Sequence, residues 1–153
     1  MPVGTGVPGI VRAVARPWVA RLRHVPTERH LHWRRLFYVP AEVADRLAGR
    51  RDPRLPPRWL RTAGRGDFEA VGSAYLDLFV RLGGLRPGDA VLDIGCGAGR
   101  MALPLTRYLD DAGSYEGFDV VPSAVRWCQR HITPRHPRFR FTVVDLANAR
   151  YRP

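Results

Sequence analysis

The segment that most constrains the fold of this chain is VLDIGCGAGR, residues 91–100. Its apolar beginning is typical of a short buried strand, and a region of helical periodicity follows it. Gly95, Gly97 and Gly99 have no Cβ, so they permit positive φ angles and let a ligand approach the backbone closely. Parallel sheets bind ligands at such turns, outside the carboxyl ends of their strands. The segment therefore predicts a ligand-binding α/β domain. The alternative is a tight strand–helix turn that binds nothing.

Strands and helices alternate in the pattern from residue 66 onward. This alternation predicts a parallel sheet with right-handed crossover connections, which is the first half of a Rossmann-like, doubly wound α/β fold. Asp67 is the expected N-cap of the first helix, and Gly83 and Gly84 are expected to end it. The expected elements are helices over residues 68–82, 99–109 and 122–131, and strands over residues 90–94, 115–120 and 138–144.

Residues 1–65 differ in composition from the domain expected over residues 66–153. They contain 14 Arg and four acidic residues, a net charge of +10, whereas residues 66–153 contain 11 Arg and ten acidic residues, a net charge of +1. All 25 basic residues are Arg, which indicates a coding bias of a GC-rich genome. We interpret this region as a solvated basic extension rich in Arg and Pro. Contact with nucleic acid or with an anionic membrane surface is the alternative.

Within this extension, helical spacing predicts one helix over residues 11–22. A second helix is expected over residues 41–48, between Pro40 and Gly49. Three prolines indicate an extended linker over residues 50–61. We also expect four aromatic side chains of the extension, Trp18, Trp33, Phe37 and Tyr38, to pack on the domain, the alternative being that they stack on bases.

A dinucleotide-binding loop is the nearest rival interpretation of the glycine segment. Its G-x-G-x-x-G pattern, counted from Gly95, requires glycine at position 100, where this chain has Arg100. A side chain at that position would crowd the packing of helix against sheet. Asp93 would also repel a pyrophosphate, whereas it would attract a ligand with a positive amino group. The loop thus favours a cationic ligand, and an NAD-dependent oxidoreductase domain is the alternative.

The pattern Asp93-x-Gly95-x-Gly97-x-Gly99 resembles motif I of the class I S-adenosylmethionine-dependent methyltransferases. Three wider runs, GDFEAVG at residues 66–72, GRMALPLTRYLD at 99–110 and YEGFDVVPSAVRWCQR at 115–130, are similar to bacterial members of that superfamily. The resemblance covers roughly residues 60–153. It implies S-adenosyl-L-methionine as the cofactor, with its methionine part held by Asp93 and by the loop residues Gly95, Cys96, Gly97 and Gly99.

Two later acids complete the expected cofactor site. Asp119 ends the second expected strand, where a carboxylate can accept hydrogen bonds from both ribose hydroxyls. The resemblance implies this role for Asp119, with Val120 beside the adenine. The alternative is an N-cap for the helix that Pro122 opens. The resemblance also implies that Asp145 and Leu146, after the third strand, contact the adenine amine and ring.

The resemblance implies methyl transfer to a small-molecule or saccharide-like acceptor. No catalytic residue is assigned, because the family builds its acceptor pocket from later strands. We expect a truncated gene product that lacks this pocket, the alternatives being one part of a split enzyme and a non-catalytic fragment that binds the cofactor or a partner. The strand centred on Leu92 should then have an unpaired edge through which chains can associate.

The two cysteines, Cys96 and Cys128, form neither a CxxC pair nor a metal-binding pattern. This usage predicts a reduced, cytoplasmic protein without a bound metal. No apolar run reaches the roughly 18 residues of a membrane span, so we expect none.

Overall fold

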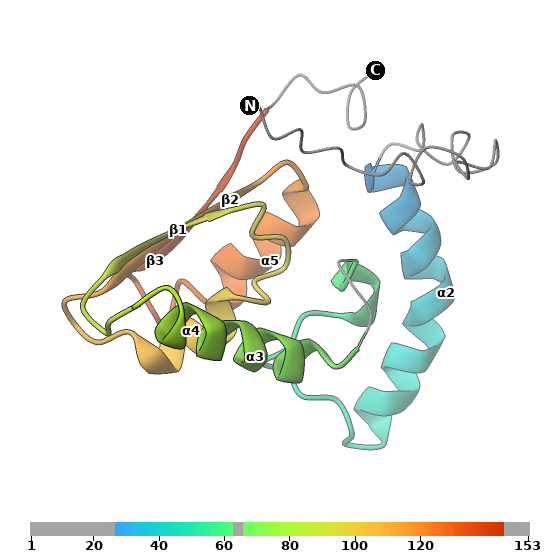
Figure 1. Ribbon diagram of the computed structural model, residues 1–153. Coiled ribbons are helices and arrows are strands. Elements are labelled where there is room, and N and C mark those ends of the chain that lie inside the picture. The colour runs from blue at the N-terminus through green and yellow to red at the C-terminus, as the bar shows by residue number, and fades with distance from the viewer. Residues whose placement is uncertain (1–26, 63–65, 146–153) are drawn as a thin grey trace, which may run out of the picture.

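The computed structural model describes residues 27–62 and 66–145 (Figure 1). The helix expected over residues 11–22 lies outside them, as does Trp18. The described elements are, in chain order, α2 (Thr27–Leu47), the short 3-10 helix η2 (Arg58–Leu60), α3 (Phe68–Arg81), β1 (Ala90–Ile94), α4 (Ala102–Tyr108), β2 (Ser114–Asp119), α5 (Pro122–His131) and β3 (Phe139–Val143).

The three strands form one parallel sheet in the order β1-β2-β3. The register aligns Leu92 with Glu116 and Glu116 with Arg140, so these three side chains share one face of the sheet. Helices connect successive strands, as the Rossmann-like α/β prediction requires, and that fold class is confirmed. Within the described residues, β1 is an edge strand, so the predicted unpaired edge at Leu92 is present.

The core lies between one face of the sheet and the helices α4 and α5 (Figure 1). The Tyr115 ring is fully buried and stacks on Phe139 at a centroid distance of 5.1 Å. From the helices, Leu105 and Val125 add fully buried side chains. On the opposite face Leu92 and Ile94 are 64% and 73% exposed. The described helices therefore leave this face of the sheet, with its exposed Leu92 and Ile94, without a covering layer.

The N-terminal region is more regular than the sequence pattern indicates. Instead of a helix over residues 41–48, α2 runs continuously from Thr27 to Leu47 with Pro40 inside it. Instead of an extended linker, the segment that follows contains η2 and a fully buried Pro56. Local signals mislead here because tertiary contacts offset the hydrogen bond that a proline removes from a helix.

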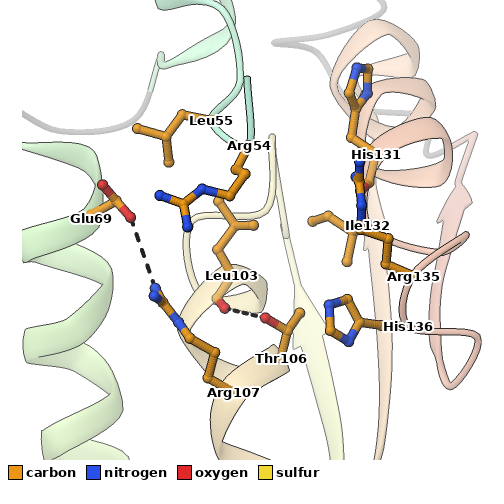
Figure 2. A pocket seen from close by; sticks show the side chains of 10 residues that line it. All are labelled: Arg54, Leu55, Glu69, Leu103, Thr106, Arg107, His131, Ile132, Arg135 and His136. Atoms are coloured by element: carbon orange, nitrogen blue, oxygen red, sulfur yellow. Dashed lines mark hydrogen bonds and ion pairs between the residues drawn. The ribbon is translucent and has the colours of Figure 1, made fainter. Parts of the chain in front are cut away.

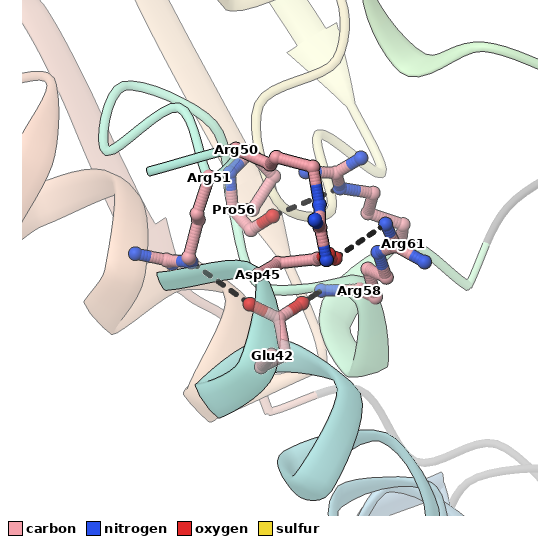
Figure 3. A network of polar contacts seen from close by, with 7 residues as sticks. All are labelled: Glu42, Asp45, Arg50, Arg51, Pro56, Arg58 and Arg61. Atoms are coloured by element: carbon pink, nitrogen blue, oxygen red, sulfur yellow. Dashed lines mark hydrogen bonds and ion pairs between the residues drawn. The ribbon is translucent and has the colours of Figure 1, made fainter. Parts of the chain in front are cut away.

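Those contacts form a polar network between α2 and the segment after it (Figure 3). Glu42 accepts a hydrogen bond of 2.8 Å from Nε of Arg51 and one of 2.5 Å from the backbone N–H of Arg58. Asp45 forms ion pairs with Arg50 and Arg58 at 3.3 and 2.7 Å. Carboxylates of α2 therefore clamp the segment after it through several charged hydrogen bonds.

The opposite face of α2 is apolar and exposed. Trp33 is 70% exposed and Phe37 is 80% exposed, so the expectation that they pack on the domain is wrong. The face of α2 that packs on the domain is instead the one that carries Leu31, which enters the core at 2% exposure. A helix that buries one face necessarily turns the other face outward.

The boundaries in the domain follow the expected pattern closely. β1 and α5 have the expected limits, and Asp67 accepts a hydrogen bond of 2.8 Å from Ala70 N as the N-cap of α3. α4 is shorter than expected and begins at Ala102, because the turns of the glycine loop extend to position 101. Phe139 and Phe141 point inward from β3 as expected, whereas Val143 at the strand end is 41% exposed.

Candidate cofactor site

The glycine loop follows β1 and adopts the expected positive φ angles, +90° at Gly95, +52° at Gly97 and +77° at Gly99. The backbone N–H groups of Gly95 and Cys96 both donate to the carbonyl of Phe118, at 2.9 and 3.1 Å. These bonds tie the loop to the end of β2. The loop is therefore a fixed turn at the carboxyl edge of the sheet, where α/β folds bind ligands.

The three loop glycines serve two different purposes. A Cβ at Gly95 or Gly97 would meet no atom within 4 Å, so these two positions border open space. A Cβ at Gly99 would lie 2.9 Å from Cδ1 of Ile132 and 3.1 Å from Sγ of Cys128. Gly99 thus lets the loop pack against α5, while Gly95 and Gly97 keep the backbone accessible to a ligand.

Asp93 is the acid of this site. Its Oδ2 accepts a hydrogen bond of 2.5 Å from the hydroxyl of Tyr115. Burial raises the pKa of Asp93, and the nearby charge of Asp119 adds to this rise, while the Tyr115 hydrogen bond lowers the pKa. Asp93 has no ion pair with any described residue. A partly buried carboxylate of this kind is stabilised by a cationic ligand.

Asp119 at the end of β2 holds the loop from the other side. Its Oδ2 accepts a 2.8 Å hydrogen bond from Gly97 N, and its Oδ1 accepts one of 2.8 Å from Val121 N. The N-cap position of α5 is Val121 and not Asp119, so the alternative role of helix cap is not seen. The carboxylate thus fixes the conformation of the glycine loop directly.

A pocket of about 360 Å³ opens beside the loop, and Asp93, Gly95, Cys96 and Gly97 line it. Its other wall comes from parts of the chain that the sequence pattern did not link to the site, namely Arg61, Phe68, Tyr75 and Arg100. The signals available were weak. Arg100 directly follows the loop, and Phe68 and Tyr75 are seven residues apart on one face of α3.

The wall of the pocket carries positive charge close to its acid. The guanidinium carbons of Arg100 and Arg61 lie 5.0 and 5.5 Å from the centre of the Phe68 ring. Arg100 Nε is buried and has no hydrogen-bond partner within the part of the chain that the structure describes. A buried donor without a partner is costly, so this atom would gain from an anionic group of a ligand.

The remaining predicted site residues lie at the same edge of the sheet or outside the described residues. Val120 directly follows Asp119 and is partly buried, and Asp145 is exposed two residues after β3. Leu146 lies outside the described residues. Cys96 is buried beneath the loop, and burial raises its pKa to about 12, so its thiol stays neutral and fills space.

A parallel sheet with a glycine loop after its first strand defines a nucleotide-type cofactor-binding domain of the α/β class. Residues 91–153 match the family model described as a methyltransferase domain. The match begins in β1 and includes the loop. Together with motif I, this match over residues 91–153 supports the class I S-adenosylmethionine-dependent methyltransferase superfamily for this part of the chain, with S-adenosyl-L-methionine as the cofactor.

Two curated methyltransferases are similar to part of this chain. A probable cobalt-precorrin-6B C(15)-methyltransferase of Thermoplasma acidophilum is 33% identical over 64 residues, which are 40% of this chain and 32% of that protein. A 23S rRNA (uracil(1939)-C(5))-methyltransferase of Alkalilimnicola ehrlichii is 35% identical over 86 residues, 53% of this chain and 19% of that protein. The chain thus spans about a third or less of the length of these two relatives.

Solved methyltransferase structures are also similar to this chain over part of its length. A protein-L-isoaspartate O-methyltransferase matches 48% of this chain and 23% of its own, with 24% identity and a TM-score of 0.42. A coclaurine N-methyltransferase bound to N-methylheliamine and S-adenosylhomocysteine matches 84% of this chain and 49% of its own, with 15% identity and a TM-score of 0.44.

Among the described residues, no group of three or more side chains could bind a metal ion. Every helix among them is too short or too polar to cross a membrane.

Proposed function

We propose that this chain binds S-adenosyl-L-methionine in the pocket beside the glycine loop and that it serves methyl transfer to a small-molecule or saccharide-like acceptor. One observation carries the proposal. The pocket is lined both by the Asp93 carboxylate and by the Arg100 guanidinium, whose Nε is buried without a partner in the described residues. An amino-acid group has one positive and one negative end, so it complements this pair.

We assign each residue of the proposed site a role from its chemistry. Asp93 would attract the positive amino end of the methionine part, and Arg100 would bind its carboxylate. Gly95 and Gly97 leave the backbone open to the ligand. Toward the nucleoside, the proposed contacts are those of Asp119 with the ribose hydroxyls and of Val120, Asp145 and Leu146 with the adenine.

The bound cofactor would supply a methyl group on a sulfonium, which is already electrophilic. The protein then has to bind and orient the reactants and exclude competing reactions. Holding donor and acceptor in line provides much of the acceleration in such a transfer. The proposed contribution of the described pocket residues is therefore to bind and orient the cofactor.

An NAD-binding function is the competing proposal. Arg100 occupies the position where the dinucleotide loop requires its third glycine. In addition, Asp93 would face a diphosphate with its own negative charge. Both features disfavour NAD, whereas they agree with a zwitterionic amino-acid group.

A binding role without catalysis is supported by the free edge of the sheet. Leu92 and Ile94 of this edge strand are mostly exposed, and apolar strand edges associate readily. We propose that further polypeptide, from this protein or from a partner, covers the edge. Both cysteines are free thiols, which agrees with the proposed cytoplasmic location.

Isothermal titration of the chain with S-adenosylhomocysteine and with NAD tests the proposal directly. Circular dichroism first establishes that the sample contains helix and sheet. We expect S-adenosylhomocysteine to bind and NAD not to bind. Binding of NAD alone, or of neither ligand by a folded sample, would contradict the assignment. A radiolabelled methyl assay then separates an enzyme from a cofactor-binding fragment.

A further inference from the structure

A second pocket, of about 220 Å³, shares no lining residue with the cofactor pocket. It lies between the segment after α2, the first turn of α3, α4, and the end of α5 with the turn that follows. Leu55, Leu103 and Ile132 give it an apolar component. None of the residues predicted for the cofactor lines this second pocket, so the proposed function leaves it without a role.

The polar residues of this pocket are mostly cationic. Arg54 and Arg107 lie on one side, and His131, Arg135 and His136 lie on the other (Figure 2). They come from three separate stretches of sequence, so their convergence is a product of the fold. Among the lining residues Glu69 is the single acid, and three Arg against one Glu leave a net charge of +2 before any histidine is protonated.

The contacts of these cations leave donor capacity for a ligand. Arg107 pairs with Glu69 loosely, at 3.9 Å, and Arg54 pairs with Asp52 at 2.7 Å on the exposed rim. Arg135 donates to the backbone carbonyl of His131 at 3.1 Å and has no ion pair among the described residues. A guanidinium has five donors, so each of these groups retains several for an anion.

The histidines provide further polar contacts. His131 Nδ1 lies 2.9 Å from the carbonyl oxygen of Trp127, and a carbonyl only accepts, so this nitrogen carries the proton. The ring of His131 also stacks on Trp127 at 4.7 Å. His136 is partly buried beside Arg135 in the turn after α5. His131 is therefore held in place at the wall of the pocket by its contacts with Trp127.

We propose that this pocket binds an organic phosphate. Its phosphoryl group would lie among Arg54, Arg107 and Arg135, and its apolar part would contact Leu103 and Ile132. Guanidinium groups suit phosphate because their planar forks donate paired hydrogen bonds to its oxygens. Even with Asp52, which pairs with Arg54 at the rim, the Arg residues outnumber the acids, so the pocket favours an anionic group. The apolar lining favours an organic ester over the inorganic ion.

Titration calorimetry of the full chain with phenyl phosphate, inorganic phosphate and phenol tests both parts of this proposal. We expect phenyl phosphate to bind more tightly than inorganic phosphate, and phenol to bind weakly or not at all. Equal affinity for phenyl and inorganic phosphate would overturn the organic part of the proposal. Absence of binding by phenyl phosphate would overturn the site.

A charge-matched pair of double variants separates the pocket from general basicity. R107Q with R135Q removes two pocket cations, whereas R86Q with R126Q removes two exposed cations that do not line it. We expect the first pair to weaken phenyl phosphate binding at least about tenfold and the second to leave it unchanged. Equal losses in both would show unspecific attraction by a basic protein and contradict the site.

A readout on the unmodified chain does not depend on how the variants fold. In nuclear magnetic resonance spectra, phenyl phosphate should shift the ring signals of His131 and His136 and leave those of His30 and His32 in place. Shifts confined to His30 and His32 would overturn the proposal. Binding of S-adenosylhomocysteine, tested separately, should be the same in the presence and absence of phenyl phosphate.

Discussion

The hydroxyl of Tyr115 donates a hydrogen bond of 2.5 Å to Oδ2 of Asp93, between the central strand and its neighbour. Tyr115 is fully buried, and Phe139 stacks on its ring. The acid of the candidate cofactor site is thus oriented by a side chain from the core. This arrangement couples the packing of the sheet to the charge of the site, and the first two predictions depend on it.

Replacing Asp93 by Asn should weaken binding of S-adenosylhomocysteine and raise stability at neutral pH. Asn can still accept from Tyr115, so the variant removes the charge and keeps the contact. The loss of a charged hydrogen bond should cost about 1.5–3 kcal/mol of binding free energy. Because burial raises the pKa of Asp93, the ionised carboxylate destabilises the fold at neutral pH.

Calorimetry and thermal unfolding measured over a pH series check this prediction. The stability advantage of Asp93→Asn should shrink as the pH falls through the raised pKa of Asp93, because the wild-type group then becomes neutral too. Asp111→Asn, at an exposed position, is the control for loss of one negative charge. Unchanged affinity in Asp93→Asn would disprove the amino-group contact.

Replacing Tyr115 by Phe should shift the pH dependence of cofactor binding upward. The Tyr115 hydrogen bond lowers the pKa of Asp93, so its removal raises that pKa further. The carboxylate then becomes protonated at a higher pH, and the affinity for a cationic ligand falls there. Titrations of S-adenosylmethionine across a pH series give the midpoint. A midpoint that moves downward, or not at all, would contradict the coupling.

A Val at position 97 should abolish cofactor binding. Gly97 has a φ of +52°, and a Cβ there would point into open space at the pocket. Gly84 is the matched control, because it has a φ of +68° and equally open surroundings but does not line the pocket. Each substitution should cost about 1–2 kcal/mol of stability for the left-handed backbone.

Calorimetry with S-adenosylhomocysteine on both folded variants distinguishes the two effects. Gly97→Val should lose binding while Gly84→Val retains it. Binding retained by Gly97→Val would show that the ligand does not pass close to this part of the loop.

Replacing Asp119 by Ala should weaken both the fold and the binding site. The backbone N–H groups of Gly97 and Val121 lose their acceptor, which should cost about 1–3 kcal/mol of stability. Loss of affinity alone therefore does not establish a ribose contact. The ribose contact is isolated by a cycle that compares S-adenosylhomocysteine with its 2′-deoxy analogue on the wild-type chain and on Asp119→Ala.

In this cycle the analogue should bind the wild-type chain about 1.5–3 kcal/mol more weakly than the parent compound. In Asp119→Ala the two compounds should bind alike. An equal penalty for the analogue in both proteins would rule out the hydrogen bond from Asp119 to that hydroxyl.

Replacing Ile94 by Lys should reduce self-association of the isolated chain. Ile94 is 73% exposed on the edge strand of the described sheet, and charged side chains protect such edges. Size-exclusion chromatography with light scattering gives the mass at several concentrations. Leu82→Lys replaces an apolar residue of similar exposure that follows α3 and is not in the sheet, so it should have no effect. Similar masses for all three proteins would show that the edge does not associate.

The strand–loop–helix pattern was sufficient to predict β1, β2 and α5 and to place Asp93 and Asp119 at one edge of the sheet. These features are local, because alternating burial and glycine spacing are set by neighbours in the chain. The same approach failed for α2. Pro40 indicated a boundary, but the helix continues through it because Glu42 and Asp45 contact residues 50–58.

By itself the sequence determined the fold class, the loop that leaves backbone open to a ligand, and the acid next to it. Only the tertiary structure decided that Tyr115 holds Asp93, that Arg61 and Arg100 face that acid's pocket, and that Gly99 serves packing. The physical reason is distance along the chain. Side chains that are far apart in sequence meet only when the sheet and helices pack, and no local pattern records which of them will touch.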